Sequence, residues 1–111
     1  MAQVEYIENN AVIRVLLGVP QRHKHLRLAI KLANGRVLLF SEATVANIVR
    51  AYVTVKTHPQ VRAVELVGMS LKERKPEYAK YQLLETRRDP NEIESELAKL
   101  LELAKPVHRQ I

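Results

Sequence analysis

The dipeptide Asn34-Gly35 constrains this chain more than any other feature, because it separates two apolar runs that can each alternate between two faces. Asn-Gly between such runs is the strongest short-range signal of a β-hairpin with a two-residue type I′ turn. The runs 26–33 and 36–41 are therefore predicted to be antiparallel strands. A two-residue loop places Ala29 opposite Phe40.

The predicted register decides which side chains share a face of the hairpin, because directly opposite residues point to the same side. One face is then apolar and is predicted to meet the core: Leu28, Ile30, Leu32, Val37 and Leu39. The other face is mixed: Arg27, Ala29, Lys31, Arg36, Leu38 and Phe40.

Three more strands and a helix are predicted around the hairpin. Residues 11–18 form an apolar, β-branched run that predicts a buried strand. Residues 42–58 repeat apolar side chains at helical spacing and stop before Pro59, although a strand over 51–56 competes with this helix. Two further strands are predicted at 61–69 and 78–86, antiparallel to each other and joined by a charged connection at 70–77.

The last predicted element is an amphipathic helix over residues 89–105. Asp89 is suited to be its N-cap, Pro90 to occupy the first helical position, and Glu92 to complete a capping box. Pro106 then ends it. The apolar stripe consists of Ile93, Leu97, Leu100, Leu101 and Ala104.

These elements predict an α+β fold in the order β-ββ-α-ββ-α. We expect one antiparallel sheet of about five strands, with one helix across its core face. A length of 111 residues suits a single domain over 1–111. Within it, residues 11–86 hold the sheet and first helix, and 89–105 form the C-terminal helix, a possible dimerisation element.

The charge is unevenly distributed along the chain. Residues 1–88 carry a net charge of +8 and residues 89–111 carry −2, within a total of +6. A basic body indicates an acidic partner; a merely solvated surface, as in heat-adapted proteins, is the competing interpretation. With no long apolar run and no signal-peptide pattern, we expect a cytoplasmic protein that does not bind membranes.

No catalytic pattern is recognisable in the sequence. There is no cysteine, Asp89 is the only aspartate, and neither a Walker loop nor a Gly-x-Gly-x-x-Gly sequence occurs. His23 and His25 are two residues apart, but zinc usually needs three or four protein ligands. We therefore expect a protein that is not an enzyme and has no cofactor and no metal site.

The mixed face of the hairpin predicts binding of single-stranded DNA or RNA, because bases can stack on apolar surface while cations follow the phosphates. The core of this predicted site is Arg27, Lys31, Arg36, Leu38 and Phe40; Tyr78 and Lys80 extend it, and Arg22 and Lys24 supply cations at its rim. Two alternatives remain open. The C-terminal helix or a dimer partner could cover Leu38 and Phe40, or the basic surface could meet an acidic protein in an assembly.

In arrangement, the chain resembles the ThermoDBP-like single-stranded DNA-binding proteins of hyperthermophilic archaea. The likeness spans residues 11–105: a hairpin (LRLAIKLANGRVLLF), a helix (EATVANIVRAYVTVK), two strands and a Leu-rich terminal helix (NEIESELAKLLELA). It implies sequence-tolerant binding in a cleft with an apolar floor and basic walls, and self-association through the terminal helix into a homodimer or larger homo-oligomer. Phe40, Leu38, Arg27 and Lys31 match that description in kind.

Overall fold

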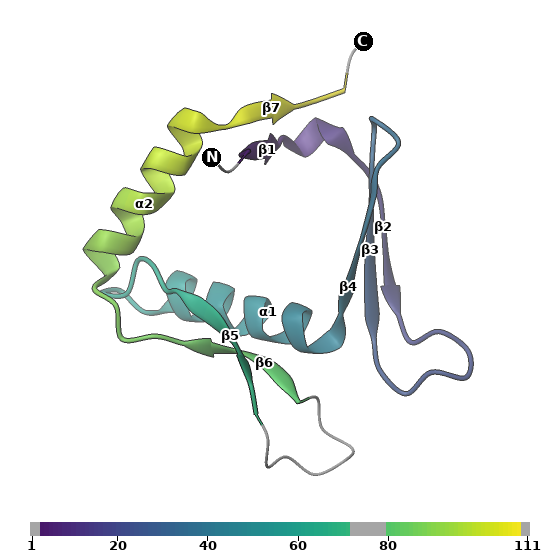
Figure 1. The fold of residues 1–111 in the computed structure, drawn as a ribbon, viewed down its shortest axis with the longest axis horizontal. Helices are drawn as coiled ribbons and strands as arrows, with labels where there is room; N and C mark the ends of the chain where they lie inside the picture. The colour runs from purple at the N-terminus through teal and green to yellow at the C-terminus, as the bar shows by residue number, and fades with distance from the viewer. Residues whose placement is uncertain (1–2, 72–79, 110–111) are drawn as a thin grey trace. The chain divides into compact units, whose positions relative to one another are not determined.

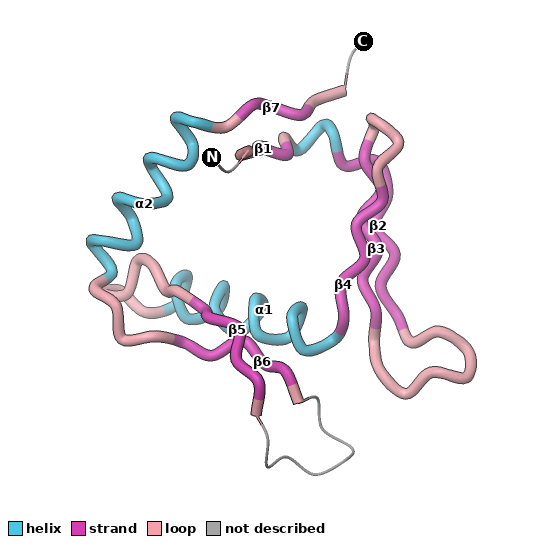
Figure 2. The backbone as a smooth tube through the Cα atoms, in the orientation of Figure 1, coloured by secondary structure: helices cyan, strands magenta, loops and turns pink. Residues whose placement is uncertain are grey.

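The computed structural model describes residues 3–71 and 80–109, in which strands and helices alternate (Figures 1 and 2). The elements are β1 (Glu5–Ile7), a 3-10 turn (Asn9–Ala11), β2 (Val12–Gly18), β3 (Arg27–Leu32), β4 (Val37–Ser41), α1 (Glu42–Thr57), β5 (Leu66–Ser70), β6 (Tyr81–Glu85), α2 (Pro90–Leu103) and β7 (Lys105–Val107). The chain divides into two compact units. Unit 1 comprises Met1–Glu42 and Leu97–Ile111, and unit 2 comprises Ala43–Glu96.

The α+β class is confirmed, but the single sheet of about five strands is not. The described strands form a three-stranded sheet in the order β2-β3-β4 and two separate pairs, β1-β7 and β5-β6. The sheets β2-β3-β4 and β5-β6 are antiparallel, as predicted. Neither helix of the described chain combines the length and the apolar character that a bilayer crossing requires.

The hairpin is present, but its predicted register is wrong by one residue. Lys31 lies opposite Val37, and Ala29 lies opposite Leu39. The loop therefore contains three residues, 33–35, and Gly35 at its end has a φ of +92°.

Asn-Gly serves this loop as well as the two-residue turn. A type I turn followed by a left-handed residue makes a three-residue hairpin loop, and glycine adopts that conformation without a steric penalty. Here the Gly35 N–H donates to the Leu32 carbonyl (3.0 Å), and the Leu32 N–H donates to the Arg36 carbonyl (2.9 Å). Asn34 Oδ1 accepts the Arg36 N–H at 3.0 Å. The longer loop reverses the face that each β4 side chain occupies relative to β3.

Strands β1 and β7 were not predicted. They pair in parallel, with Tyr6 opposite Pro106, and the Lys105 N–H donates to the Val4 carbonyl at 2.8 Å. Each is three residues long. A three-residue strand is too short to display a period in the sequence.

In the rest of the chain, the helices were predicted more accurately than the boundaries of the strands. The first helix is confirmed at Glu42–Thr57, which excludes the competing strand over 51–56. Strand β5 begins at Leu66, five residues later than predicted, and pairs with β6 as expected. Most of the predicted connection over 70–77 lies outside the described residues.

The N-cap of α2 is confirmed, because Asp89 Oδ1 accepts the Asn91 N–H at 2.8 Å. The Glu92 carboxylate, predicted to reach back to the cap, lies 3.5 Å from Arg88 Nε.

Each unit has a small buried centre among its described residues. Ala11 and Leu32 are buried in unit 1, where the Ala33 N–H donates to the Ala11 carbonyl at 2.8 Å. Ala63 and Ile93 are buried in unit 2. Many larger apolar side chains are exposed, including Leu39 at 72%.

Replacing Gly35 by alanine should lower the free energy of unfolding by about 1–2 kcal/mol, because an L-residue pays that penalty in the left-handed region. No atom lies within 4 Å of a Cβ built at Gly35, so the effect is purely conformational. Gly18 is equally open but has no such φ, and Gly18→Ala is the matched control. Urea unfolding of both variants measures the difference; equal stability would contradict the three-residue loop.

Candidate nucleic-acid interface

The observed register gives the three-stranded sheet a basic face and an apolar face. Across the sheet, Leu16 pairs with Ala29 and Ala29 with Leu39; Arg14 pairs with Lys31 and Lys31 with Val37. Paired residues share a face. We define the basic face as Arg14, Leu16, Arg27, Ala29, Lys31, Val37 and Leu39, and the apolar face as Val15, Leu17, Leu28, Ile30, Leu32, Leu38 and Phe40.

The basic face is the more accessible of the two over β4. Val37 and Leu39 are 52% and 72% exposed, while Leu38 and Phe40, on the apolar face, are half-buried. Leu16 is also exposed. The face therefore presents aliphatic surface between cations.

The cations of this face are not neutralised within the described chain. Arg14, Arg27 and Lys31 have no Asp or Glu carboxylate within ion-pair distance among the described residues. The Arg27 guanidinium donates to the neighbouring Leu26 carbonyl at 3.1 Å. Their charge is therefore available to an external anion.

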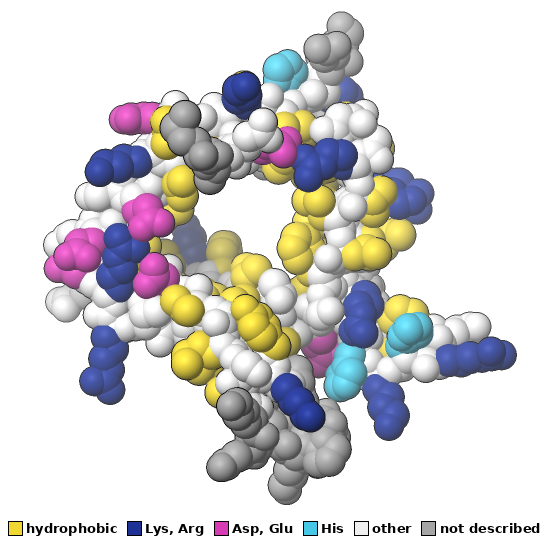
Figure 3. Space-filling model, viewed as in Figure 1, with side chains coloured by type: hydrophobic (Ala, Val, Ile, Leu, Met, Phe, Trp, Pro, Cys, Tyr) yellow, Lys and Arg dark blue, Asp and Glu magenta, His cyan; other side chains and the backbone are white. Residues whose placement is uncertain are grey.

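The loop between β2 and β3 adds further cationic groups at one end of the same sheet. Arg22, Lys24, His23 and His25 are all exposed, as predicted for the two cations at the rim. Arg22 has a φ of +68°. In Figure 3, Lys, Arg and His side chains gather around this loop, beside hydrophobic side chains on the strands.

Three of the predicted interface residues do not belong to the basic face. Leu38 and Phe40 lie on the opposite face, because the three-residue loop shifts β4 by one residue against β3. The guanidinium of Arg36 is engaged by Glu5, with 2.7 Å between Nη1 and Oε1. Arg27 and Lys31 are the two core predictions that remain together.

Four residues of the basic face, Arg14, Leu16, Val37 and Leu39, were not predicted as part of the interface. Strand β2 carries no turn signal of its own, so its register against β3 could not be read from the sequence. A bulge between Val12 and Arg14 shifts that register. The two β4 residues could have been found by weighing the three-residue alternative for the Asn-Gly loop.

The predicted extension of the site belongs to unit 2. Lys80 is exposed just before β6, and Tyr78 lies outside the described residues. Tyr81, which was not predicted, is an aromatic side chain 64% exposed beside Lys80. Its ring occupies the space that a Cβ on Gly68 would need, so this glycine allows the ring to lie on β5.

Unit 2 contains a dense ion-pair cluster around Arg88. Its Nη1 lies 2.6 Å from Glu96 Oε1 and 3.0 Å from Glu65 Oε2, and Thr86 Oγ1 lies 3.0 Å from Glu65 Oε1. The hydrogen bonds to Glu96 and then Glu65 raise the pKa of the Arg88 guanidinium above its ordinary value. Glu65 is therefore engaged in a cluster that ties α2 to the segments flanking β5 and β6.

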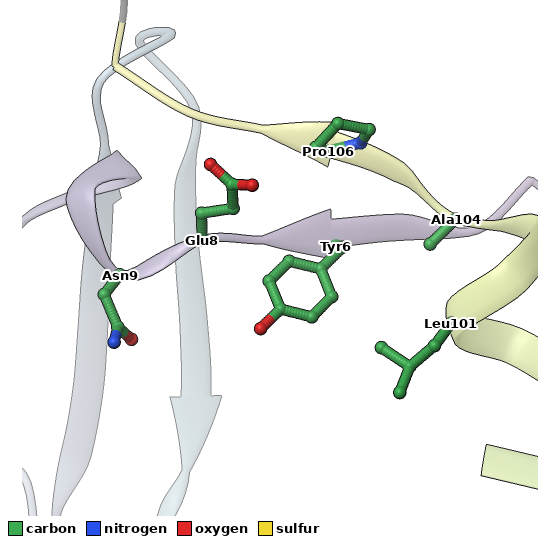
Figure 4. A pocket seen from close by; sticks show the side chains of 6 residues that line it. All are labelled: Tyr6, Glu8, Asn9, Leu101, Ala104 and Pro106. Carbon is green, nitrogen blue, oxygen red and sulfur yellow. The ribbon is translucent and has the colours of Figure 1, made fainter. Parts of the chain in front are cut away.

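A hollow of about 490 Å³ lies in unit 1, beside the β1–β7 pair and the end of α2. Tyr6, Glu8, Asn9, Leu101, Ala104 and Pro106 line it. In Figure 4, the Tyr6 and Leu101 side chains lie below β1 in the view, whereas the Glu8 carboxylate points up from β1 toward β7. Glu8 Oε2 lies 3.9 Å from His108 Nδ1, so this carboxylate has a histidine for a neighbour.

Histidine and carboxylate side chains do not gather into a metal-binding set in the part of the chain that the structure describes, where no three potential ligands meet. Comparisons with models of known families, with curated proteins and with solved structures found no significant match.

Replacing Arg88 by alanine should lower the melting temperature by a few degrees, because three carboxylates then lose their shared cation. Arg88→Lys is the matched control: it keeps the charge and should recover part of the loss, since lysine lacks the forked geometry of arginine. Thermal unfolding followed by circular dichroism measures both variants. An unchanged melting temperature for Arg88→Ala would show that the cluster contributes nothing to stability.

Proposed function

We propose that this protein is a non-catalytic, sequence-tolerant binder of single-stranded DNA or RNA, and that the basic face of the β2-β3-β4 sheet is its contact surface. The observation that carries the proposal is a combination on one face. Three cations have no carboxylate partner among the described residues, and three aliphatic side chains, Leu16, Val37 and Leu39, are exposed beside them.

The chemistry of that face favours a single strand over a duplex. The cations can follow phosphates, whose neutralisation supplies most of the sequence-independent affinity. An unpaired base exposes its flat surface, which can lie against aliphatic side chains, whereas a duplex hides those surfaces by stacking. The face has no aromatic side chain, so we expect phosphate contacts to contribute more than base stacking.

The rim of the surface would be formed by Arg22 and Lys24, whose loop is exposed and reaches beyond the strands. A flexible cationic loop can meet a backbone of variable path, which suits binding without sequence preference. We further propose that the protein acts as a homodimer or larger homo-oligomer. The cytoplasmic location and dimerisation through α2 remain predictions.

The double variant Arg14→Ala, Lys31→Ala should weaken binding to a single-stranded oligonucleotide at least tenfold at low salt. If each cation neutralises one phosphate, the slope of log affinity against log salt should fall by about 1.4. Fluorescence anisotropy at several salt concentrations measures both quantities, with DNA and RNA oligonucleotides compared against duplex DNA.

The matched control is Arg50→Ala, Lys56→Ala, which removes the same charge from exposed positions on α1. At physiological salt we expect it to change affinity by less than about twofold, since distant charges are then largely screened. Equal losses in the two double variants would mean that net charge, and not this face, drives binding. Absence of binding by the unmodified protein at low salt would reject the proposal and favour an acidic protein as partner.

A further inference from the structure

The outer edge of β4 is the least protected strand edge among the described residues. Strand β4 is the last strand of its sheet, and its five residues, VLLFS, contain no charge, glycine or proline. Native proteins normally protect such an edge with charged residues, prolines or bulges, because its unpaired N–H and C=O groups recruit another strand.

The other edges of the antiparallel sheets carry features that discourage pairing. Strand β2, at the opposite edge of the same sheet, has a bulge at Ile13 and the charged Arg14 beside it. In unit 2, β5 contains Gly68, and β6 ends with Glu85. Among these edges, that of β4 is therefore the one best suited to pair with another strand.

The hairpin register shows which groups of β4 are unpaired. Leu32 and Arg36 form a hydrogen-bonded pair at the loop. Hydrogen-bonded and non-hydrogen-bonded pairs alternate along an antiparallel ladder. The backbone groups of Leu38 and Phe40 therefore point to β3, and those of Val37 and Leu39 point outward. The Ser41 N–H also points outward, but the Ser41 carbonyl precedes α1 and accepts the first hydrogen bond of that helix.

We propose that two copies of this chain pair antiparallel along β4, with Leu39 opposite Leu39 of the second copy. In this alignment Val37 lies opposite Ser41, so the outward groups of Val37 and Leu39 and the Ser41 N–H of each strand form about four N–H···O bonds. Each Leu38 then lies opposite a Phe40 on the apolar face. A two-fold axis perpendicular to the sheet relates the copies, as in a closed isologous dimer.

The pairing also affects how the protein would bind nucleic acid, and this part of the inference rests on the proposed function. A two-fold axis perpendicular to the sheet keeps both basic faces on the same side. The dimer then has one continuous sheet of six strands, in which neighbouring strands are about 4.8 Å apart. One face of that sheet carries Arg14, Arg27 and Lys31 of both copies. A nucleic-acid strand crossing the dimer axis would contact cations from both copies.

The substitution Leu39→Lys tests the pairing directly, because a charged side chain at the centre of an edge strand opposes strand addition. Leu39 is 72% exposed, so the hairpin should tolerate lysine. Leu16→Lys is the matched control, since Leu16 lies in the same row of the same face on the opposite edge strand. Light scattering without nucleic acid should give about twice 12.7 kDa for the unmodified protein and for Leu16→Lys, but 12.7 kDa for Leu39→Lys.

A monomeric unmodified protein, a dimeric Leu39→Lys variant, or dissociation by both lysine variants would overturn the pairing. Amide hydrogen exchange of the unmodified protein gives a test that needs no variant. The Leu39 and Ser41 amides should exchange as slowly as those of Leu38 and Phe40. Exchange of these two amides as fast as that of the His25 amide, in the loop between β2 and β3, would also overturn the pairing.

The same preparations separate this inference from the proposed function. If oligonucleotides bind, the monomeric Leu39→Lys variant should show a salt slope about two-thirds that of the dimer, because each complex then offers three native cations and the added lysine, against six cations in the dimer. If no oligonucleotide binds but Leu39→Lys still dissociates the dimer, the pairing stands and the nucleic-acid proposal fails.

Discussion

The three-residue loop at 33–35 is the constraint on which the organisation of unit 1 depends. Gly35 in the left-handed region ends the turn and sets which β4 residue meets which β3 residue. A shift of one residue moves every β4 side chain to the other side of the sheet. The identity of the basic face, the half-burial of Phe40 and the exposure of Leu39 all follow from the length of this loop.

Elements with strong local signals could be predicted from the sequence, and relations between elements could not. The first helix was predicted from its apolar spacing, and α2 from its spacing and from the cap at Asp89. Loop length escaped prediction because Asn-Gly suits both a two-residue type I′ turn and a three-residue loop that ends in a left-handed residue. Strands β1 and β7 escaped because each pairs with a partner about 100 residues away and has only three residues.

The sequence predicted the chemical character of the candidate site better than it predicted which residues belong to it. Lys31 and Arg27 were predicted and lie on one face, whereas Phe40 lies on the opposite one. Counting charges in the sequence could not distinguish cations that form ion pairs from those that do not, because each Lys or Arg counts as +1 whatever surrounds it. Arg36 and Arg88 form ion pairs with carboxylates of their own units. Only the three-dimensional structure distinguishes them from Arg14, Arg27 and Lys31, which have no such partner among the described residues.

The parallel pairing of β1 with β7 has a consequence for the order in which the protein acquires its structure. Unit 2 is encoded as one continuous segment, whereas unit 1 combines an early and a late segment. During synthesis, which proceeds from the N-terminus, β1 must wait without its partner until residues 105–107 have left the ribosome. The β2-β3-β4 sheet and then unit 2 can fold before that point. Closure of the β1–β7 pair, a contact of high sequence separation, is then a late and comparatively slow step.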